Sequence, residues 1–365
     1  MKIDLPENLL DRNPIEIDTA AVEEALYNKC VLITGAAGSI GSEIVRQVAQ
    51  FRPQLLLLCD ISESPLHHLT LELQSNFPQL QFIPFVCDVR NETRMNMIFS
   101  QHHPQYVYHA AAYKHVPLME AHPSESVLTN VWGTKILADL SVRHGVEVFV
   151  MISTDKAVNP CSIMGTCKRI AEIYVQSLDA QLHAENKGIR FITTRFGNVL
   201  GSNGSVVLHF EEQIAKGGPV TVTHPEIERY FMTIQEACQL VLEAGTLGNG
   251  GEIFIFDMGE PVKIIALAEK MIRFAGKEPY RDINIEFTGL RPGEKLYEEL
   301  LTNDEHFIST RNKRIMTGIV DEHEYRNHSV IKSKIDVLIE TAQYYQEKQV
   351  VEHIKGLVPE YITHQ

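Results

Sequence analysis

The chain lacks the signatures of several protein classes. Its 365 residues contain no apolar run of about 18 residues, and its N-terminus does not resemble a signal peptide. The six cysteines never stand in CxxC spacing, and the 16 histidines form no HExxH pattern. The sequence as given therefore predicts neither secretion nor a membrane span, no metal site, and the reduced cysteines of a cytoplasmic protein.

Positive charge is also scarce. Lys and Arg number 33 against 47 Asp and Glu, a formal net charge of -14. Nucleic-acid surfaces need clustered cations, so we expect no nucleic-acid partner. A small phosphate-bearing ligand stays compatible, because it needs few local cations. A hydrophobic content of 44% and a charged content of 22% are typical of a globular protein.

Strand-like apolar segments alternate with amphipathic, helix-like segments over the first 200 residues. The expected strands lie at 30–35, 55–60, 82–88, 106–112, 146–154 and 189–199. This rhythm predicts a parallel sheet covered on both faces, a doubly wound, Rossmann-like α/β fold. Gly- and Pro-punctuated pieces then predict a smaller C-terminal lobe, with one more strand at 251–259 and a charged helix at 331–349.

A glycine-rich turn follows the first expected strand. "TGAAGSIGSE" (34–43) places Gly35, Gly38 and Gly41 at the start of a helix, in GxxGxxG spacing. Glycines let the backbone approach a pyrophosphate, which then meets helix N–H groups. The alternative is an ordinary tight turn.

Two carboxylates make the alternative weaker. Asp60 ends the second strand, about 20 residues after Gly41, where it can accept from ribose hydroxyls. Asp88 ends the third strand, near the expected adenine. No arginine follows in "DISESPLHHL", and a carboxylate repels a 2′-phosphate, so NAD is favoured over NADP. The predicted cofactor residues are Gly35, Gly38, Ser39, Ile40, Gly41, Asp60, Asp88, Val89, Ala110, Ala111 and Lys168.

The stretch "STDKAVNPCSIMGTCK" (153–168) is similar to the catalytic segment of short-chain dehydrogenases, with one exception. Thr154 and Lys168 match the hydroxyl and the lysine of that class, but Met164 stands where its acid/base tyrosine would be. The YxxxK match Tyr344–Lys348 lies in a charged tail and is attributed to chance. Asp155 and Lys156 are the compensating acid/base candidates.

Each of these residues also has a plain structural interpretation. Thr154 can be a helix cap, and Asp155–Lys156 a solvated surface pair. Lys168 can be a surface lysine of a helix, and Met164 can simply pack against a ligand.

Five segments in order carry a more specific resemblance. "HAAAYKHVPLME" (109–120), "STDKAVNP" (153–160), "TRFGNVLGSNGSV" (194–206), "HPEIERYFMTIQEA" (224–237) and "GLRPGEKLYEELL" (289–301) resemble the UDP-N-acetylglucosamine 4,6-dehydratases, extended short-chain dehydrogenases/reductases. The similarity runs from about residue 10 to residue 310. Methionine at position 164 is usual in their longer, membrane-anchored branch.

The resemblance implies an internally redox-neutral reaction that serves surface polysaccharide or protein glycosylation. Hydride leaves sugar C4 for NAD, Lys156 removes the C5 proton, Asp155 protonates the departing 6-hydroxyl, and hydride returns to C6. These roles require both side chains to be held uncharged in a dry cleft. Thr154 and Lys168 are the candidates for handling the 4-hydroxyl, a step that stays open.

The same resemblance implies a UDP-sugar site. Arg229 and Arg291 are expected to bind the diphosphate, Asn198 a phosphate oxygen, Glu294 the uridine ribose, and Lys114 the sugar or its phosphates. Rival functions are a dehydratase that also inverts C5, a UDP-sugar C4 epimerase, and a catalytically inactive NAD-binding scaffold.

The expected organisation has four parts. They are an N-terminal extension (1–28), an NAD-binding Rossmann domain (29–199, with 232–257 returning to it), a UDP-sugar lobe (200–231 and 258–310) and a C-terminal helical region (311–365). "ENLLDRNPIEID" (7–18) resembles the junction after the membrane segments of longer relatives, so we expect a soluble catalytic part. In a full-length form it would lie at the inner face of the membrane, although Met1 can equally be a natural start. A homo-oligomer through helices of the nucleotide domain, one of which carries Trp132, is also expected.

Overall fold

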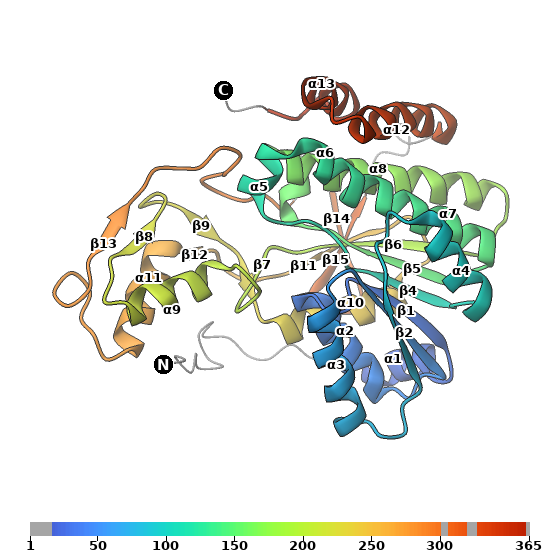
Figure 1. The fold of residues 1–365 in the computed structure, drawn as a ribbon, viewed down its shortest axis with the longest axis horizontal. Helices are drawn as coiled ribbons and strands as arrows, with labels where there is room; N and C mark the ends of the chain where they lie inside the picture. The colour runs from blue at the N-terminus through green and yellow to red at the C-terminus, as the bar shows by residue number, and fades with distance from the viewer. Residues whose placement is uncertain (1–16, 301–305, 320–326, 363–365) are drawn as a thin grey trace.

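The computed structural model describes residues 17–300, 306–319 and 327–362. Within these residues the main sheet has nine strands (Figure 1). In spatial order they are β3 (Phe82–Val86), β2 (Leu55–Asp60), β1 (Cys30–Thr34), β4 (Tyr106–His109), β5 (Val148–Ile152), β6 (Arg190–Arg195), β11 (Ile253–Phe256), β15 (Ile315–Ile319) and β14 (His306–Ser309). All pairs from β3 to β11 are parallel, which confirms the predicted doubly wound fold.

Helices cover both faces of this sheet, which explains why its central strands are apolar without alternation. All five residues of β1 are buried. One face carries α1 (Thr19–Leu26), α2 (Ser39–Gln50), α3 (Glu63–Asn76) and α10 (Ile234–Leu247). The other carries α4 (Glu92–His102), α7 (Gly133–His144) and α8 (Ile163–Ala184). The strand order reverses between β1 and β4, where such sheets bind ligands beyond their carboxyl ends.

A smaller lobe lies beyond that edge (Figure 1). It contains α9 (Val206–Ala215), β8 (Val220–Val222), β9 (Glu228–Arg229), β12 (Val262–Lys263), α11 (Ile264–Phe274) and β13 (Ile285–Phe287). β8 pairs with β13 and β9 with β12, around a separate apolar cluster that includes Phe210 and Met271. Two short strands, β7 (Asn198–Val199) and β10 (Phe231–Met232), pair with each other and connect the lobe to the sheet.

The C-terminal region differs from the expectation that residues 311–365 are helical. β15 begins at Ile315 and pairs antiparallel with β11, and β14 continues the edge from within the segment assigned to the lobe. β14, the edge strand, and β15, which lies between β14 and β11, are short and only partly apolar, so their sequence signal is weak. Helices follow at α12 (His328–Gln343) and α13 (Glu347–Leu357), close to the expected charged helix.

The two C-terminal helices form an antiparallel hairpin on the outer face of α8 (Figure 1). Ile335, Leu338, Ile354 and Val358 are fully buried in the same apolar cluster as the α8 residue Tyr174. The partly buried Trp132 belongs to a π-helical segment, Val127–Trp132, on which α12 also packs. The hairpin therefore covers part of the helical face of the nucleotide domain, including the segment that carries Trp132.

The N-terminal segment is not a separate extension from residue 17 onward. Val22 and Leu26 of α1 are fully buried in the core shared with α10. Most of the stretch that resembles a membrane junction lies outside the described residues. None of the described helices is long and apolar enough to cross a bilayer.

Candidate active site

The glycine-rich turn lies between β1 and α2, at the carboxyl edge of the sheet. Gly35 has a φ of +65°, and a Cβ there would lie 2.6 Å from the backbone nitrogen of Ala111. A Cβ on Gly41 would lie 1.9 Å from the carbonyl oxygen of Gly35. Both positions thus require glycine. Helix α2 begins at Ser39 with Gly38 as its cap, so its free N–H groups face this edge.

Asp60 anchors this turn from the end of β2. Its Oδ2 accepts from the backbone N–H of Ala37 and its Oδ1 from that of Ser62, both at 2.8 Å. The carboxylate is buried, and its orientation is held by these two bonds. Each oxygen keeps a second lone pair, which a ribose hydroxyl can use.

A cavity of about 280 Å³ extends from the turn across the ends of β2, β3 and β4. Its lining includes many of the predicted cofactor residues: Gly35, Gly38, Asp60, Asp88, Val89, Ala110 and Ala111. Asp88 forms an ion pair with Arg90 at 2.7 Å. Burial alone would raise the pKa of Asp88, but the Arg90 hydrogen bonds hold it below its ordinary value. The cavity at the ends of β2, β3 and β4, the helix N-terminus and the Asp60 carboxylate fit an adenine dinucleotide. No cluster of His, Cys, Asp and Glu suited to a metal occurs in the described residues.

The predicted acid/base pair lies in a single tight turn after β5. Asp155–Ala157 form a 3₁₀ turn capped by Thr154, whose Oγ1 accepts from the backbone N–H of Lys156 at 3.3 Å. The same hydroxyl donates to Asp155 Oδ1 at 2.9 Å. The Asp155 side chain is 1% exposed and that of Lys156 is 23% exposed. Thr154 is thus a cap and a partner of Asp155 at once, and the pair is not a solvated surface pair.

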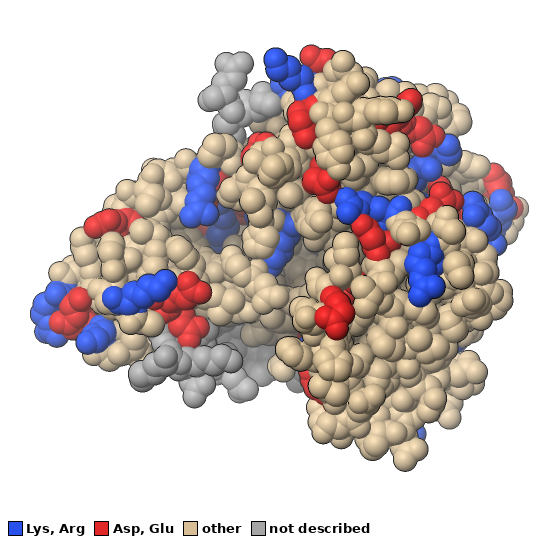
Figure 2. Space-filling view, in the orientation of Figure 1, with Lys and Arg blue, Asp and Glu red and all other residues tan. Residues whose placement is uncertain are grey.

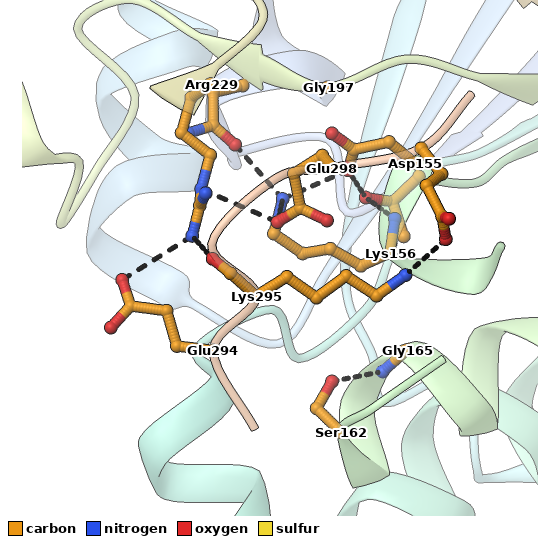
Figure 3. A network of polar contacts seen from close by, with 12 residues as sticks. Asp155, Lys156, Ser162, Gly165, Gly197, Arg229, Glu294, Lys295 and Glu298 are labelled. Carbon is orange, nitrogen blue, oxygen red and sulfur yellow. Dashed lines mark hydrogen bonds and ion pairs between the residues drawn. The ribbon is translucent and has the colours of Figure 1, made fainter. Parts of the chain in front are cut away.

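Lys156 is surrounded by oxygen atoms (Figure 3). Its Nζ donates to Asp155 Oδ1 at 3.0 Å and to Asn198 Oδ1 at 3.1 Å, and lies 3.4 Å from Glu298 Oε1. Burial would lower the pKa of Lys156, but the Asp155 and Glu298 carboxylates raise it above its ordinary value. In this arrangement a second carboxylate, Glu298, favours a charged Lys156, whereas the expected roles need an uncharged one.

Met164 and Lys168 project from successive turns of α8. Met164 is 3% exposed, and Ser162 caps the helix by accepting from the Gly165 N–H at 3.1 Å. Lys168 Nζ donates to the carbonyl oxygen of Ile152 at 2.7 Å. Burial lowers the pKa of Lys168 to about 8, against a smaller opposing effect of Glu172. Lys168 is thus buried, with its amino group at the end of β5, and is not a surface lysine.

The expected substrate residues are brought together only in part. Arg229 is buried and donates to the carbonyl oxygens of Glu228, Lys295 and Leu296, at 2.7, 2.7 and 3.2 Å. It also forms ion pairs with Glu294 at 3.6 Å and Glu298 at 3.5 Å (Figure 3).

The other substrate candidates are more open. The Arg291 side chain is exposed, while its backbone N–H donates to Glu294 Oε2 at 3.1 Å. Lys114 is exposed too, next to Tyr113, whose backbone is held by two hydrogen bonds to the Asn130 side chain. On the face shown in Figure 2, Lys and Arg are interspersed with Asp and Glu and form no continuous basic patch.

The sequence profile of the family described as "Polysaccharide biosynthesis protein" matches residues 31–320. The chain belongs to this family, within the extended short-chain dehydrogenases/reductases. It is 50% identical to the "Capsular polysaccharide biosynthesis protein CapD" of Staphylococcus aureus, over 92% of this chain and 54% of the relative. This family member therefore spans about half the length of that relative.

Other relatives of this family member carry names with an activity. It is 32% identical to a "UDP-glucose 4-epimerase" of Rickettsia canadensis, over 76% of this chain and 79% of the relative. It is 31% identical to a "UDP-N-acetylglucosamine 4,6-dehydratase (inverting)" of Campylobacter jejuni, over 78% of this chain and 81% of the relative. The X-ray structure of Pen from Bacillus thuringiensis has a TM-score of 0.75 and 34% identity, covering 81% of this chain and 90% of that one.

Sequence reasoning missed two groups in this family member. Glu298 lies in "EKLYEEL", where two adjacent glutamates look like a solvated surface, and no spacing signal sets it apart. Glu172 is fully buried in α8 and pairs with Arg195. Its position one turn after Lys168, among apolar helix residues, was a usable signal for a buried ion pair.

Proposed function

We propose that the chain binds NAD and catalyses the 4,6-dehydration of UDP-N-acetylglucosamine to a UDP-4-keto-6-deoxy sugar. The observation that carries this proposal is the Asp155–Lys156 ion pair after β5, in which the carboxylate is buried and the lysine partly buried, beside a helix in which Met164 stands in place of the acid/base tyrosine. Such a pair serves an elimination, which needs both an acid and a base. The product would enter the synthesis of a surface polysaccharide or a protein-linked glycan.

The cofactor would lie across the carboxyl ends of β1 to β4. The pyrophosphate would meet the N-terminus of α2, and Asp60 would accept from the adenosine ribose hydroxyls. A buried carboxylate there disfavours the additional phosphate of NADP. When bound, NAD would take the C4 hydride of the sugar and later return it to C6.

Thr154 supports a path for the proton of the 4-hydroxyl. Its own hydroxyl proton already points to Asp155 Oδ1. If Thr154 accepts the sugar proton while passing on its own, Asp155 becomes the carboxylic acid that the departing 6-hydroxyl needs. Lys168, charged below a pKa of about 8, would stabilise negative charge on O4. Met164 would pack against the bound ligands.

The substrate's diphosphate would be bound by Arg229 and Arg291. Arg229 would have to exchange its carboxylate partners for phosphate oxygens, which a guanidinium binds bidentately. Glu294 would accept from the uridine ribose, Asn198 would contact a phosphate oxygen, and Lys114 would contact the sugar or its phosphates.

The rival functions differ in what they require of these residues. A C4 epimerase needs a tyrosine at position 164 and no acid/base pair. A dehydratase that inverts C5 uses the same residues with reprotonation from the other face. An inactive NAD-binding scaffold has no use for an ion pair between the buried Asp155 and the partly buried Lys156.

Incubation of the purified chain with NAD and UDP-N-acetylglucosamine tests the proposal. Mass spectrometry should show a product lighter by one water molecule, and in D₂O that product should carry deuterium at C5. NMR of C5 separates the inverting from the retaining reaction. An isomer of unchanged mass would support the epimerase, and recovery of unaltered substrate would support the scaffold.

A further inference from the structure

Residues 293–298, a segment of the small lobe, cross over the turn Asp155–Ala157, which is called the catalytic turn below (Figure 3). A Cβ on Gly293 would lie 2.9 Å from the Ser162 side chain, so the backbone is in close contact with the start of α8. Lys295 Nζ donates to the carbonyl oxygen of Val158 at 3.0 Å. These contacts bring Glu298 to Lys156, 142 positions earlier in the sequence.

Glu298 is buried among charges rather than exposed on a surface. Its side chain is 2% exposed, and its Oε1 lies 3.4 Å from Lys156 Nζ and 3.5 Å from Arg229 Nε. Within the described residues, Oε2 is buried and has no hydrogen-bond partner. A buried polar atom without a partner is costly to the fold, so its presence beside Lys156 points to a task.

The chemistry of the proposed function leaves such a task open. Lys156 faces Asp155 of its own turn, Asn198 of β7, Arg229 of β9 and Glu298 of the crossing segment. This surrounding favours the ammonium form, which cannot remove a proton from C5. Asp155 cannot relieve Lys156 of its proton, because Asp155 receives the proton of the 4-hydroxyl.

We propose that Glu298 is a positioning residue for Lys156. Glu298 holds the Lys156 amino group next to Asp155, and it takes one proton from that amino group before C5 is deprotonated. This inference rests on the proposed function. In this step an N–H bond of Lys156 breaks and an O–H bond of Glu298 forms, so that an ammonium and a carboxylate become an amine and a carboxylic acid with no change in net charge.

The rest of the cycle then balances without an outside acid or base. The Lys156 amine takes the C5 proton, the 6-hydroxyl leaves as water with the proton of Asp155, and hydride returns to C6. The Lys156 ammonium reprotonates C5, and the resulting amine recovers its proton from Glu298. Binding of the diphosphate to Arg229 would start the cycle, because it would draw a cation away from the Glu298 carboxylate.

The first test measures the pH at which Lys156 loses its proton, in the absence of substrate. The rate of Lys156 acetylation by acetic anhydride, followed by peptide mass spectrometry, is recorded against pH for wild type, E298Q and E299Q. Loss of the Glu298 carboxylate should move the midpoint to lower pH by about one unit or more. Glu299 pairs with Lys295 instead and is 51% exposed, so E299Q is the matched control and should not move it. Equal midpoints in all three proteins would overturn the inference.

The second test measures catalysis against pH. In E298Q, C4 oxidation, seen as reduced cofactor in a single turnover, should persist, while water loss and deuterium exchange at C5 slow about 10²-fold at neutral pH. The E298Q rate of water loss should recover as pH rises, because solvent then removes the Lys156 proton. E298D, which keeps a carboxylate, should keep part of the wild-type rate at neutral pH. A loss that is equal at every pH and includes C4 oxidation would overturn the inference. Failure of the wild type to eliminate water would instead refute the proposed function, while the acetylation test still decides the pairing.

Discussion

Arg195 donates from Nε and Nη2 to the two carboxylate oxygens of Glu172, at 2.9 and 2.7 Å. Both side chains are fully buried, at 1% and 0% exposure. Ser153, the residue directly before Thr154 in the sequence, donates from Oγ to the same carboxylate at 2.6 Å. The ion pair therefore joins β6, α8 and the residue before the Thr154-capped turn Asp155–Ala157, and it restricts where that turn can lie.

Removal of one partner should be costly. R195M leaves the Glu172 charge buried with weaker partners and should destabilise the fold by about 3–5 kcal/mol, measured by urea unfolding. The matched control is R52M, since Arg52 pairs with Glu23 at 70% and 44% exposure and should cost less than about 1 kcal/mol. Similar unfolding midpoints for the two variants would contradict this prediction.

The acid/base pair should be indispensable for water loss. D155N and K156A should each slow dehydration of UDP-N-acetylglucosamine by about 10²–10⁴-fold, since each removes one proton-transfer group. NAD affinity, measured by calorimetry, should stay unchanged because neither residue lines the dinucleotide cavity. K187A changes a lysine that is 55% exposed and should behave as wild type. Near-normal turnover in D155N would refute the assignment.

The glycine turn should not accept a methyl group. In G41A the new Cβ would lie 1.9 Å from the Gly35 carbonyl oxygen, so the turn must move away from α2. We expect NAD binding to weaken at least about tenfold, equal to about 1.4 kcal/mol. G188A serves as control, because a Cβ at Gly188 meets nothing within 4 Å. Unchanged NAD affinity in G41A would show that the turn does not hold the cofactor.

Lys168 should make stability depend on alkaline pH. Its pKa is lowered by burial from 10.5 to about 8, so between these values the unfolded chain binds a proton that the folded chain does not. The contribution of Lys168 to the free energy of unfolding should thus rise with pH in this window, by about 3 kcal/mol at most. Urea unfolding at both ends of the window should show that this rise is missing in K168M. An identical pH dependence in both proteins would contradict it.

The sequence predicted the parts of the fold that depend on local pattern. The apolar runs that became β1, β2 and β5 are buried on both faces, so their composition alone indicates a covered parallel sheet. Gly35 and Asp60 were predictable because a tight turn and a strand end impose their residue types locally. β14 and β15 were not, since both are short and only partly apolar: β14 is the edge strand, and β15 lies between it and β11.

The charge balance of the site depends on contacts that sequence spacing does not show. Asp155 and Lys156 are neighbours in the chain, but Glu298 reaches them only because the lobe returns across the catalytic turn. The same return pairs Arg229 with carboxylates, although its motif suggested a cation free for phosphate. The protonation states of the site therefore depend on contacts between segments far apart in the sequence, and could not be predicted from it.

The α12–α13 hairpin has a practical consequence for work with shortened forms of the chain. If residues from His328 onward were deleted, the flank of α8 around Tyr174 would lose its apolar cover and face water. Such a fragment would tend to self-associate through the apolar surface of α8, which the hairpin covers in the intact chain. Dimers or larger species of that fragment would then result from exposed core residues, and would not reveal the interface between intact copies of the chain.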